Sequence, residues 1–297
     1  MKKTSMKMGV VALAVVAVAA IVSLNVTARA PSLKVATTSS LYDTGLWEYL
    51  ELMFEEKYGV ELDILCVGTG IALEYGKRGD VDAVVIHDKA REEQFVAEGY
   101  GVGRVPFAYN YFLIVGPPDD PAGIKGLGPE EAFKKLMEEG AENPQQIKFV
   151  SRGDESGTHA REKAIWKAAG FNYTAVQESS WAKAEEMGYI EAGRGMGPTL
   201  LMASEMNAYT LTDIGTFLAY KGKLDLVPLV EEGQILLNVY SVIAVSPEKH
   251  PDTKIEMASS LIDFLTSSEI QELIREYGVK DYGMPLFTPC AGAEPEQ

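Results

Sequence analysis

The feature that most limits the fold of this chain is a regular alternation of apolar extended segments with amphipathic helical segments. Extended segments are predicted at residues 33–37, 60–67 and 83–87, and helical segments at 44–58, 71–77 and 90–98. Within 44–58 the apolar side chains recur at helical spacing, from Leu46 and Trp47 to Phe54 and Tyr58. This βαβαβ opening predicts a mostly parallel sheet with helices on both faces.

Two longer extended runs, residues 105–118 and 235–245, lie about 130 residues apart. They enclose a second α/β region, with helices predicted at 129–139, 158–169 and 197–207 and a strand at 147–151, and a helix-rich tail follows over 253–277. We expect the two runs to cross between two lobes: residues 31–108 plus 238–297 form lobe one, and 109–237 form lobe two. The sequence therefore predicts a two-lobed α/β protein, with a ligand cleft at the ends of the strands between the lobes.

The first 30 residues are typical of an export signal. Lys2, Lys3 and Lys7 precede an uncharged apolar run of 16 residues, Gly9 to Leu24, and small residues follow up to Ala30. That run is shorter than the roughly 20 residues that comfortably span a bilayer. We predict an exported protein, periplasmic or at the extracellular face of the cell membrane. Residues 1–30 are its signal peptide, or its N-terminal anchor if the leader is not cleaved.

The charge of the chain excludes one class of partner. The 297 residues include 27 basic and 43 acidic side chains, a net charge of −16. Four of the basic residues and none of the acidic ones lie in the first 30, so the rest of the chain carries −20. Nucleic-acid affinity is built from Lys and Arg that neutralise phosphates, so we expect no nucleic-acid partner.

Two cysteines, Cys66 and Cys290, leave a redox question open. In an exported protein such a pair can form a disulfide, and it can equally remain two thiols.

Three segments share one design, in which a strand ends in a burst of Gly, Ser and Thr before a helix begins. They are residues 37–40, 68–70 and 152–158, and the last contains Arg152. Helix N-termini present unpaired N–H groups and the positive end of the helix dipole, and hydroxyls add further donors. Each burst alone is typical of an ordinary N-cap. All three together, with an arginine, predict an anion-binding site.

The motifs of common enzymes are missing from the sequence. Residues 153–157 do not form the G-x-S-x-G turn of a hydrolase, and residues 68–79 do not form a phosphate-binding Walker loop. His87, His159 and His250 have neither metal-ligand nor catalytic-triad spacing, and Ser156 with His159 is the only local nucleophile–base candidate. We predict a binding protein that is not an enzyme, with no catalytic residues, no cofactor and no cation site.

Several motifs resemble, in the same order, the tungstate-binding proteins of Tup-type ABC transporters. They are SRGDESGTHARE (151–162), TTSSLYDTGL (37–46), GTG (68–70) and AYTLTDIGTFL (208–218). The resemblance covers most of the chain after the leader and departs from the family at Ala36, where a further hydroxyl is common. It implies a periplasmic-binding-protein-like (type II) fold and a protein that hands tungstate or molybdate to a membrane permease with its ATPase. We expect it to act as a monomer.

The resemblance also implies which residues bind the oxyanion. Lobe one supplies hydroxyl donors and lobe two supplies further hydroxyls and one positive charge, from Arg152; the residues are Thr38, Ser39, Thr69, Arg152, Ser156, Thr158 and Thr210. Two carboxyls lie beside these loops: we expect Asp43 to cap a helix and Asp154 to pair with Arg152. The alternatives are a phosphate- or sulfate-binding protein of the same fold, and an anion sensor tethered by its leader. In a phosphate site such a carboxyl could accept the remaining proton of the ligand.

Overall fold

The computed structural model describes residues 30–38, 41–42, 44–184 and 188–295, so residues 1–29 of the predicted leader lie outside the described residues. Met1–Pro31 and Ser32–Gln297 form separate units, and the fold described below is that of the second unit. Within the ranges that the structure describes, no helix is long and apolar enough to cross a membrane.

The βαβαβ opening predicted from the sequence is confirmed. Strand β1 (Ser32–Thr38) lies between β2 (Glu61–Val67) and β3 (Ala83–Ile86), and both neighbours run parallel to it. Each strand is followed by a helix: α3 (Leu46–Tyr58), α4 (Thr69–Arg78) and α5 (Lys89–Ala97). The carboxyl ends of β1 and β2 are therefore at the same edge of the sheet, and the loops that leave them lead to the candidate site.

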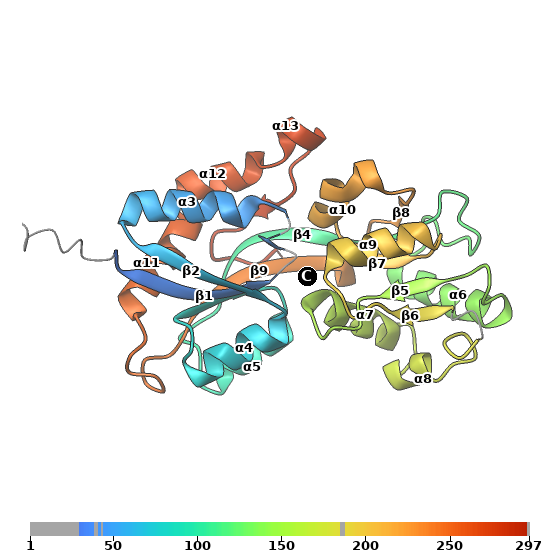
Figure 1. The fold of residues 1–297 in the computed structure, drawn as a ribbon, viewed down its shortest axis with the longest axis horizontal. Helices are drawn as coiled ribbons and strands as arrows, with labels where there is room; N and C mark the ends of the chain where they lie inside the picture. The colour runs from blue at the N-terminus through green and yellow to red at the C-terminus, as the bar shows by residue number, and fades with distance from the viewer. Residues whose placement is uncertain (1–29, 39–40, 43, 185–187, 296–297) are drawn as a thin grey trace, which may run out of the picture. The chain divides into compact units, whose positions relative to one another are not determined.

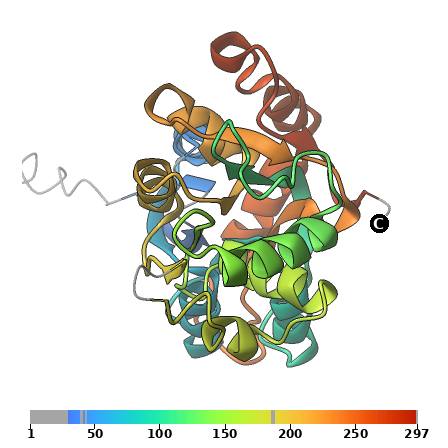
Figure 2. The same cartoon turned by 90° about the vertical axis from the view of Figure 1, so that its right-hand side faces the viewer.

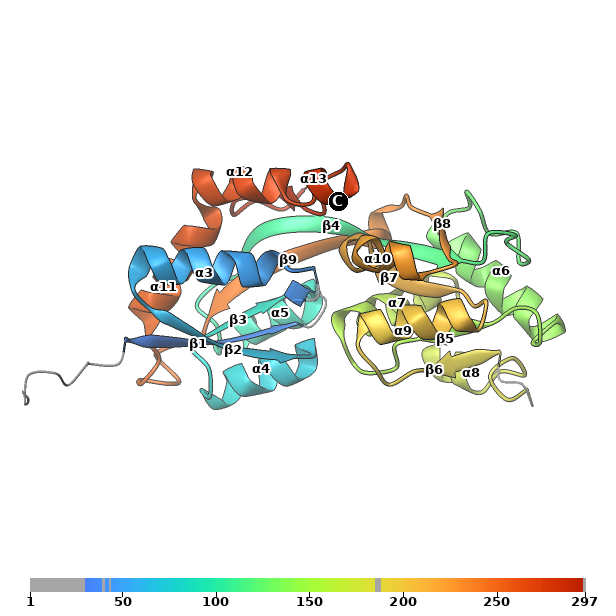
Figure 3. The same cartoon turned by 45° about the horizontal axis from the view of Figure 1, so that its top comes forward.

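Helices cover both faces of this part of the sheet, because side chains alternate along each strand. Val35 of β1 belongs to a core cluster that contains Trp47 of α3. The next residue, Ala36, belongs to another cluster that contains Phe95 of α5. Figures 1 and 3 show α3 on one face of the strands, and α4 and α5 on the other.

Two long strands continue the sheet. Strands β4 (Val105–Gly116) and β9 (Leu237–Ala244) pair with each other antiparallel, and β9 also pairs antiparallel with β3. The expectation of a mostly parallel sheet is therefore wrong beyond β3, because both long strands run against their neighbours. The C-terminal half of β4 pairs with β7 (Thr210–Asp213) and β8 (Val227–Val230), and its N-terminal half pairs with the short β10 (Thr288–Pro289). Figure 1 shows β4 and β9 running side by side through the molecule.

The region between the long strands has its own elements. The helices are α6 (Pro129–Glu142), α7 (Gly157–Ala168), α8 (Tyr173–Gln177), α9 (Met196–Glu205) and α10 (Ile214–Tyr220), and β5 (Phe149–Ser151) pairs in parallel with β6 (Tyr189–Glu191). An aromatic core that includes Phe133, Phe149, Trp166 and Trp181 lies wholly within residues 112–236. In Figure 2 the green helix α6 is nearest the viewer.

The C-terminal tail packs back onto the first region. Helices α11 (Ile255–Thr266), α12 (Ser268–Glu276) and α13 (Val279–Tyr282) form it, and Phe264 of α11 makes an edge-on contact with Phe54 of α3, with 5.4 Å between ring centroids. Cys66 and Cys290 carry thiols in the described chain, with no disulfide between them.

The predicted division into two lobes stays a prediction. In its favour, one core cluster lies within 112–236 and another draws only on residues 36–95 and 243–245. The largest cluster, however, joins Val35 of β1 to Leu200 of α9, so the two regions also share apolar packing.

Candidate functional site

Two of the three predicted junctions face each other across the interior. The first is the turn between β2 and α4, and the second is residues 152–156, the loop between β5 and α7, which we call the anion loop. A Cβ atom added to Gly68 would lie 4.0 Å from the Asp154 carbonyl oxygen, and one added to Gly70 would lie 3.9 Å from that of Glu155. Loops almost 90 residues apart in the sequence are thus neighbours.

Both junctions end at the start of a helix. Helix α4 begins at Thr69 after the extended residue Gly68, and no described side chain caps it. Helix α7 begins at Gly157, and the hydroxyl of its N-cap Ser156 accepts the His159 N–H at 3.2 Å. The uncapped N–H groups and the dipole of α4 are suited to an anion, and the Ser156 hydroxyl retains its proton for donation.

Three of the predicted binding residues carry buried donors that lack a hydrogen-bond partner within the described part of the chain. These atoms are Thr69 Oγ1, Arg152 Nε and Thr158 Oγ1. Their residues are 0%, 3% and 1% exposed. A buried polar group without a partner is costly and uncommon in native proteins. Two hydroxyls and one guanidinium nitrogen without a described partner, at facing loops, therefore indicate a site for a ligand that accepts hydrogen bonds.

The carboxyl beside Arg152 is fully engaged within the loop. Asp154 Oδ2 accepts from Arg152 Nη2 at 2.5 Å, and Asp154 Oδ1 accepts the Ser156 N–H at 3.2 Å. The expected pairing of Asp154 with Arg152 is confirmed, and it orients the guanidinium while leaving Nε for a ligand.

The remaining predicted residues differ in what the structure says of them. Thr38 is buried at the end of β1, opposite Val67 of β2. Ser39 and Asp43 lie outside the described residues. The Thr210 hydroxyl is buried but already donates to the Val150 carbonyl oxygen at 2.7 Å. The Thr210 hydroxyl is therefore already hydrogen-bonded within the fold, and its role in anion binding stays a prediction.

Sequence reasoning missed the contacts among three polar residues: Asn110 of β4, Asn238 of β9 and His87, which directly follows β3. Asn238 Nδ2 donates to Asn110 Oδ1 at 2.8 Å, and Asn238 Oδ1 lies 2.8 Å from His87 Nδ1. Asn110 Nδ2 is a further buried donor with no partner among the residues described. Both asparagines interrupt apolar strands, and that interruption was the signal available in the sequence.

His87 brings a neutral ring to the start of α7. Burial lowers the pKa of His87 to about 4, and the positive charges of Arg152 and Arg161 act in the same direction. A Cβ atom on Gly157 would lie 2.7 Å from His87 Cε1, so only glycine allows this approach. A pocket of ≈ 480 Å³ opens here between α5 and α7, lined in part by His87, Gly157 and Arg161.

Asp213 provides a second carboxyl whose oxygens are engaged. It is fully buried at the N-cap of α10, where it accepts the N–H and the hydroxyl of Thr216 at 2.9 and 2.7 Å. Burial raises its pKa, and Arg152 opposes that rise. A Cβ atom on Gly215 would lie 3.2 Å from Asp213 Oδ1 and 3.7 Å from Asn110 Nδ2, so this helix start adjoins the asparagine pair.

The donor set is suited to an oxyanion rather than to a metal ion. Hydroxyl, amide and guanidinium donors predominate, and the described residues include no group of three or more His, Cys, Asp or Glu side chains placed to hold a metal.

Comparisons with known proteins give the same picture. Residues 25–269 match the family described as a PBP superfamily domain. The tungstate-binding protein TupA of Peptoclostridium acidaminophilum is 43% identical over 263 residues, which cover 88% of this chain and 86% of the relative. The solved structure of TupA from Desulfovibrio alaskensis has 38% identity and a TM-score of 0.72, covering 88% of this chain and 100% of the other. That of the tungstate ABC transporter from Geobacter sulfurreducens has 46% identity and a TM-score of 0.70, covering 83% and 98%.

Proposed function

Because the chain belongs to the TupA family within the PBP superfamily, we propose that it captures tungstate, or the similar molybdate, and delivers it to the permease of an ABC transporter. The prediction of a solute-binding protein with this α/β fold, rather than an enzyme, is confirmed by the same relatives. The identity of the oxyanion and its delivery are the proposed steps.

The observation that carries the proposal is the set of unpaired buried donors at the facing loops. Thr69 Oγ1 comes from α4, and Arg152 Nε and Thr158 Oγ1 come from the anion loop and α7. A tetrahedral dianion offers four oxygens, each able to accept more than one hydrogen bond. Arg152 contributes a full positive charge, and charge-assisted hydrogen bonds are about twice as strong as neutral ones.

The state of the carboxyls favours an anion that carries no proton. Near neutral pH, phosphate retains a proton that a selective site must accept, whereas tungstate and molybdate are fully ionised. Both oxygens of Asp154 already accept from Ser156 and Arg152, and both oxygens of Asp213 accept from Thr216. Asp154, which lies in the anion loop, is thus already paired with a cation and a backbone N–H, and this favours a ligand that brings no proton of its own.

We assign the remaining donors by their position. Thr38 ends β1 and Ser39 is the next residue; with Thr69, they would contact the anion from one side. Ser156 and Thr158 would contact it from the other. Asn110 Nδ2 joins this set, since it is buried and has no described partner.

The wider context is also proposed. Residues 1–30 direct export, so that the protein works outside the cytoplasm, free or anchored by its leader. Its partners are the permease and the ATPase that drives it, and it acts as a monomer.

Calorimetric titration of the protein without residues 1–30 tests the function directly. Tungstate, molybdate, sulfate and phosphate are compared at equal concentration and pH. We expect tungstate or molybdate to bind at least about a hundredfold more tightly than the other two, a difference of about 3 kcal/mol. Equal or tighter binding of phosphate would overturn the proposal in favour of the phosphate alternative.

A further inference from the structure

The anion loop contains two residues in the left-handed backbone region. Gly153 has φ +59°, which glycine adopts readily, but Glu155 has φ +56° and carries a side chain. Left-handed backbone is unfavourable for a residue with a Cβ atom and persists where its surroundings hold it. Arg152 and Ser156 flank these two residues, so whatever holds them also places the binding groups.

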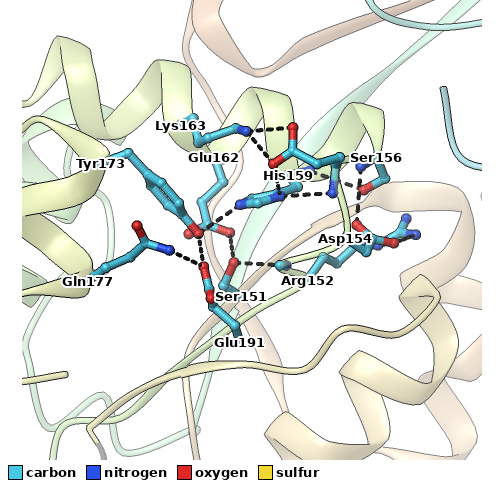
Figure 4. Close-up of polar contacts among 12 residues, drawn as sticks. Ser151, Arg152, Asp154, Ser156, His159, Glu162, Lys163, Tyr173, Gln177 and Glu191 are labelled. Carbon is cyan, nitrogen blue, oxygen red and sulfur yellow. Dashed lines mark hydrogen bonds and ion pairs between the residues drawn. The ribbon is translucent and has the colours of Figure 1, made fainter. Parts of the chain in front are cut away.

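One hold on the loop comes from His159, in the first turn of α7. The Glu155 N–H donates to His159 Nδ1 at 3.0 Å, and His159 Nε2 lies 2.7 Å from the Tyr173 hydroxyl. A backbone N–H can only donate, so Nδ1 must be unprotonated. Tyr173 gives its own proton to Glu191 Oε1 at 2.5 Å, so Nε2 must carry the hydrogen of the ring. Figure 4 shows His159 between the loop and Tyr173.

A second hold lies one helical turn further along α7. The Gly153 N–H donates to Ser151 Oγ at 3.2 Å, and Ser151 donates to Glu162 Oε2 at 2.6 Å. Glu162 is buried and also accepts from Tyr189 at 2.6 Å. The N–H groups of both left-handed residues are thus linked by hydrogen bonds to side chains of α7. None of these hydrogen bonds uses an atom that we assign to the anion.

We propose that His159, in its neutral form with the hydrogen on Nε2, is a positioning residue for the anion loop, and that protonation of its ring weakens anion binding. The inference rests on the proposed function and adds to it a regulation of the same site.

The charged groups around His159 set the direction of the effect. Burial lowers the pKa of His159, and Lys163 on the same helix acts in the same direction. The carboxylates of Glu155, Asp154 and Glu191 oppose that shift. The pKa of the ring therefore lies below that of an ordinary imidazole, and the ring is neutral at pH 7.5 and takes up a proton only as the solution becomes acidic.

Protonation would place an N–H on Nδ1, directly against the Glu155 N–H. An acceptor near this new donor is Glu155 Oε1, 3.4 Å away. To reach it, Glu155 must turn its carboxylate inward and give up the hydrogen bond from its N–H. The loop then loses the contact that holds its left-handed residue, and Ser156 moves with it.

A matched pair of substitutions isolates the Nδ1 acceptor. In His159→Asn the side-chain oxygen can stand where Nδ1 stands, whereas His159→Leu has the same shape and no acceptor. We expect the Leu variant to bind tungstate about tenfold more weakly at pH 7.5, the loss of one buried hydrogen bond, and the Asn variant to stay within about threefold of wild type. Equal affinity of the two variants would overturn the positioning role.

A pH series with wild type and His159→Asn tests the protonation step. Between pH 8 and pH 5, wild-type affinity should fall relative to that of the Asn variant, because protonation of the anion itself affects both proteins alike. Parallel profiles, or a relative gain of wild type in acid, would overturn this step.

The inference and the proposed function can fail separately. Wild type that releases no heat with any of the four oxyanions overturns the function. Wild type that binds tungstate no better than His159→Leu overturns only the inference. Nitrogen-15 NMR of the ring, which needs no ligand, should show Nε2 protonated and Nδ1 bare at pH 7.5, and the opposite tautomer would refute the geometry by itself.

Discussion

Arg152 is a buried cation with two different tasks for its guanidinium. Nη2 is bound to Asp154, and Nε has no described partner. We predict that Arg152→Ala lowers tungstate affinity about tenfold to over a hundredfold, the range of a lost charge-assisted hydrogen bond, in a calorimetric titration. Arg152→Lys should restore only part, because an ammonium cannot bond Asp154 and the anion with the same planar geometry. If the Ala variant binds like wild type, Arg152 serves only to pair with Asp154.

Two threonines from the same set of predicted residues separate a donor that awaits a ligand from one that is already engaged. Thr158 Oγ1 has no partner in the described chain, whereas Thr210 Oγ1 donates to Val150. Substitution by valine keeps the shape of each side chain and removes its hydroxyl. We predict about tenfold weaker tungstate binding for Thr158→Val and nearly unchanged binding for Thr210→Val, which should instead lower the melting temperature. The reverse order of affinities would place Thr210 at the ligand.

At the scale of elements, helix α7 carries a buried acid that should make stability depend on pH. Burial raises the pKa of Glu162 to about 7, although Ser151, Tyr189 and Trp166 donate to it. The folded chain therefore binds this proton more tightly than the unfolded chain. The stability that this adds is complete below the unfolded pKa near 4.5 and is lost as the pH rises through 7.

The side chain in Glu162→Gln cannot ionise, so the stability of this variant should increase relative to that of wild type as the pH rises. From pH 4.5 to pH 8 we predict a relative gain on the order of 3 kcal/mol in the free energy of unfolding, followed by denaturant titration at each pH. His87 and Glu92 are two other buried groups with strongly shifted pKa values, and they are present in both proteins, so their contributions cancel. A difference that does not change with pH would show that the pKa of Glu162 is the same in the folded and unfolded chains.

The sequence predicted the long elements well and missed some of the short ones, such as β6 and β7, for a physical reason. A helix such as α3 shows its apolar stripe within 13 residues, so the signal is local. Strands β6 and β7 have three and four residues, too few for a pattern, and β7 pairs with β4 from about 100 residues away. That β9 runs antiparallel to β3 is likewise a long-range fact, which explains the wrong expectation of a mostly parallel sheet.

The candidate site also has one part that local sequence predicts and another that depends on contacts between distant residues. The anion loop was predictable because its hydroxyls, its arginine and the helix that follows lie within a dozen residues. Asn110 and Asn238 are 128 residues apart, and only the pairing of β4 with β9 makes them partners. His159 was visible in the sequence, but its role depends on the backbone angle of Glu155, which residue types alone do not reveal.

At the scale of the whole molecule, the net charge of −20 after the leader opposes long-range attraction of an anion. Capture then depends on donors that act at short range and are shielded from water. The facing loops supply such donors only when they are close together. We therefore propose that the two predicted lobes close on the anion, with the crossing strands β4 and β9 as the hinge.

A contact between the predicted lobes allows closure to be tested with a residue that is not assigned to anion binding. Arg91 of α5 donates from Nη1 to the Glu155 carbonyl oxygen at 3.2 Å, and its guanidinium lies 3.7 Å from the Glu155 carboxylate. Arg91 contacts the anion loop without being assigned to the anion. Substitution of Arg91 should therefore weaken the closure of the lobes and leave the anion contacts themselves in place.

We predict that tungstate reduces the radius of gyration in small-angle scattering and raises the melting temperature in proportion to the logarithm of its concentration, because it binds only the folded chain. Arg91→Ala should retain tungstate binding at a several-fold lower affinity, with a smaller compaction at saturation. Arg91→Lys keeps the charge and a donor group, so its affinity and its compaction should lie between those of wild type and of Arg91→Ala. Tight binding by wild type without any compaction would mean that the anion sits within one lobe or that the free protein is already closed, and either result would remove the hinge from β4 and β9.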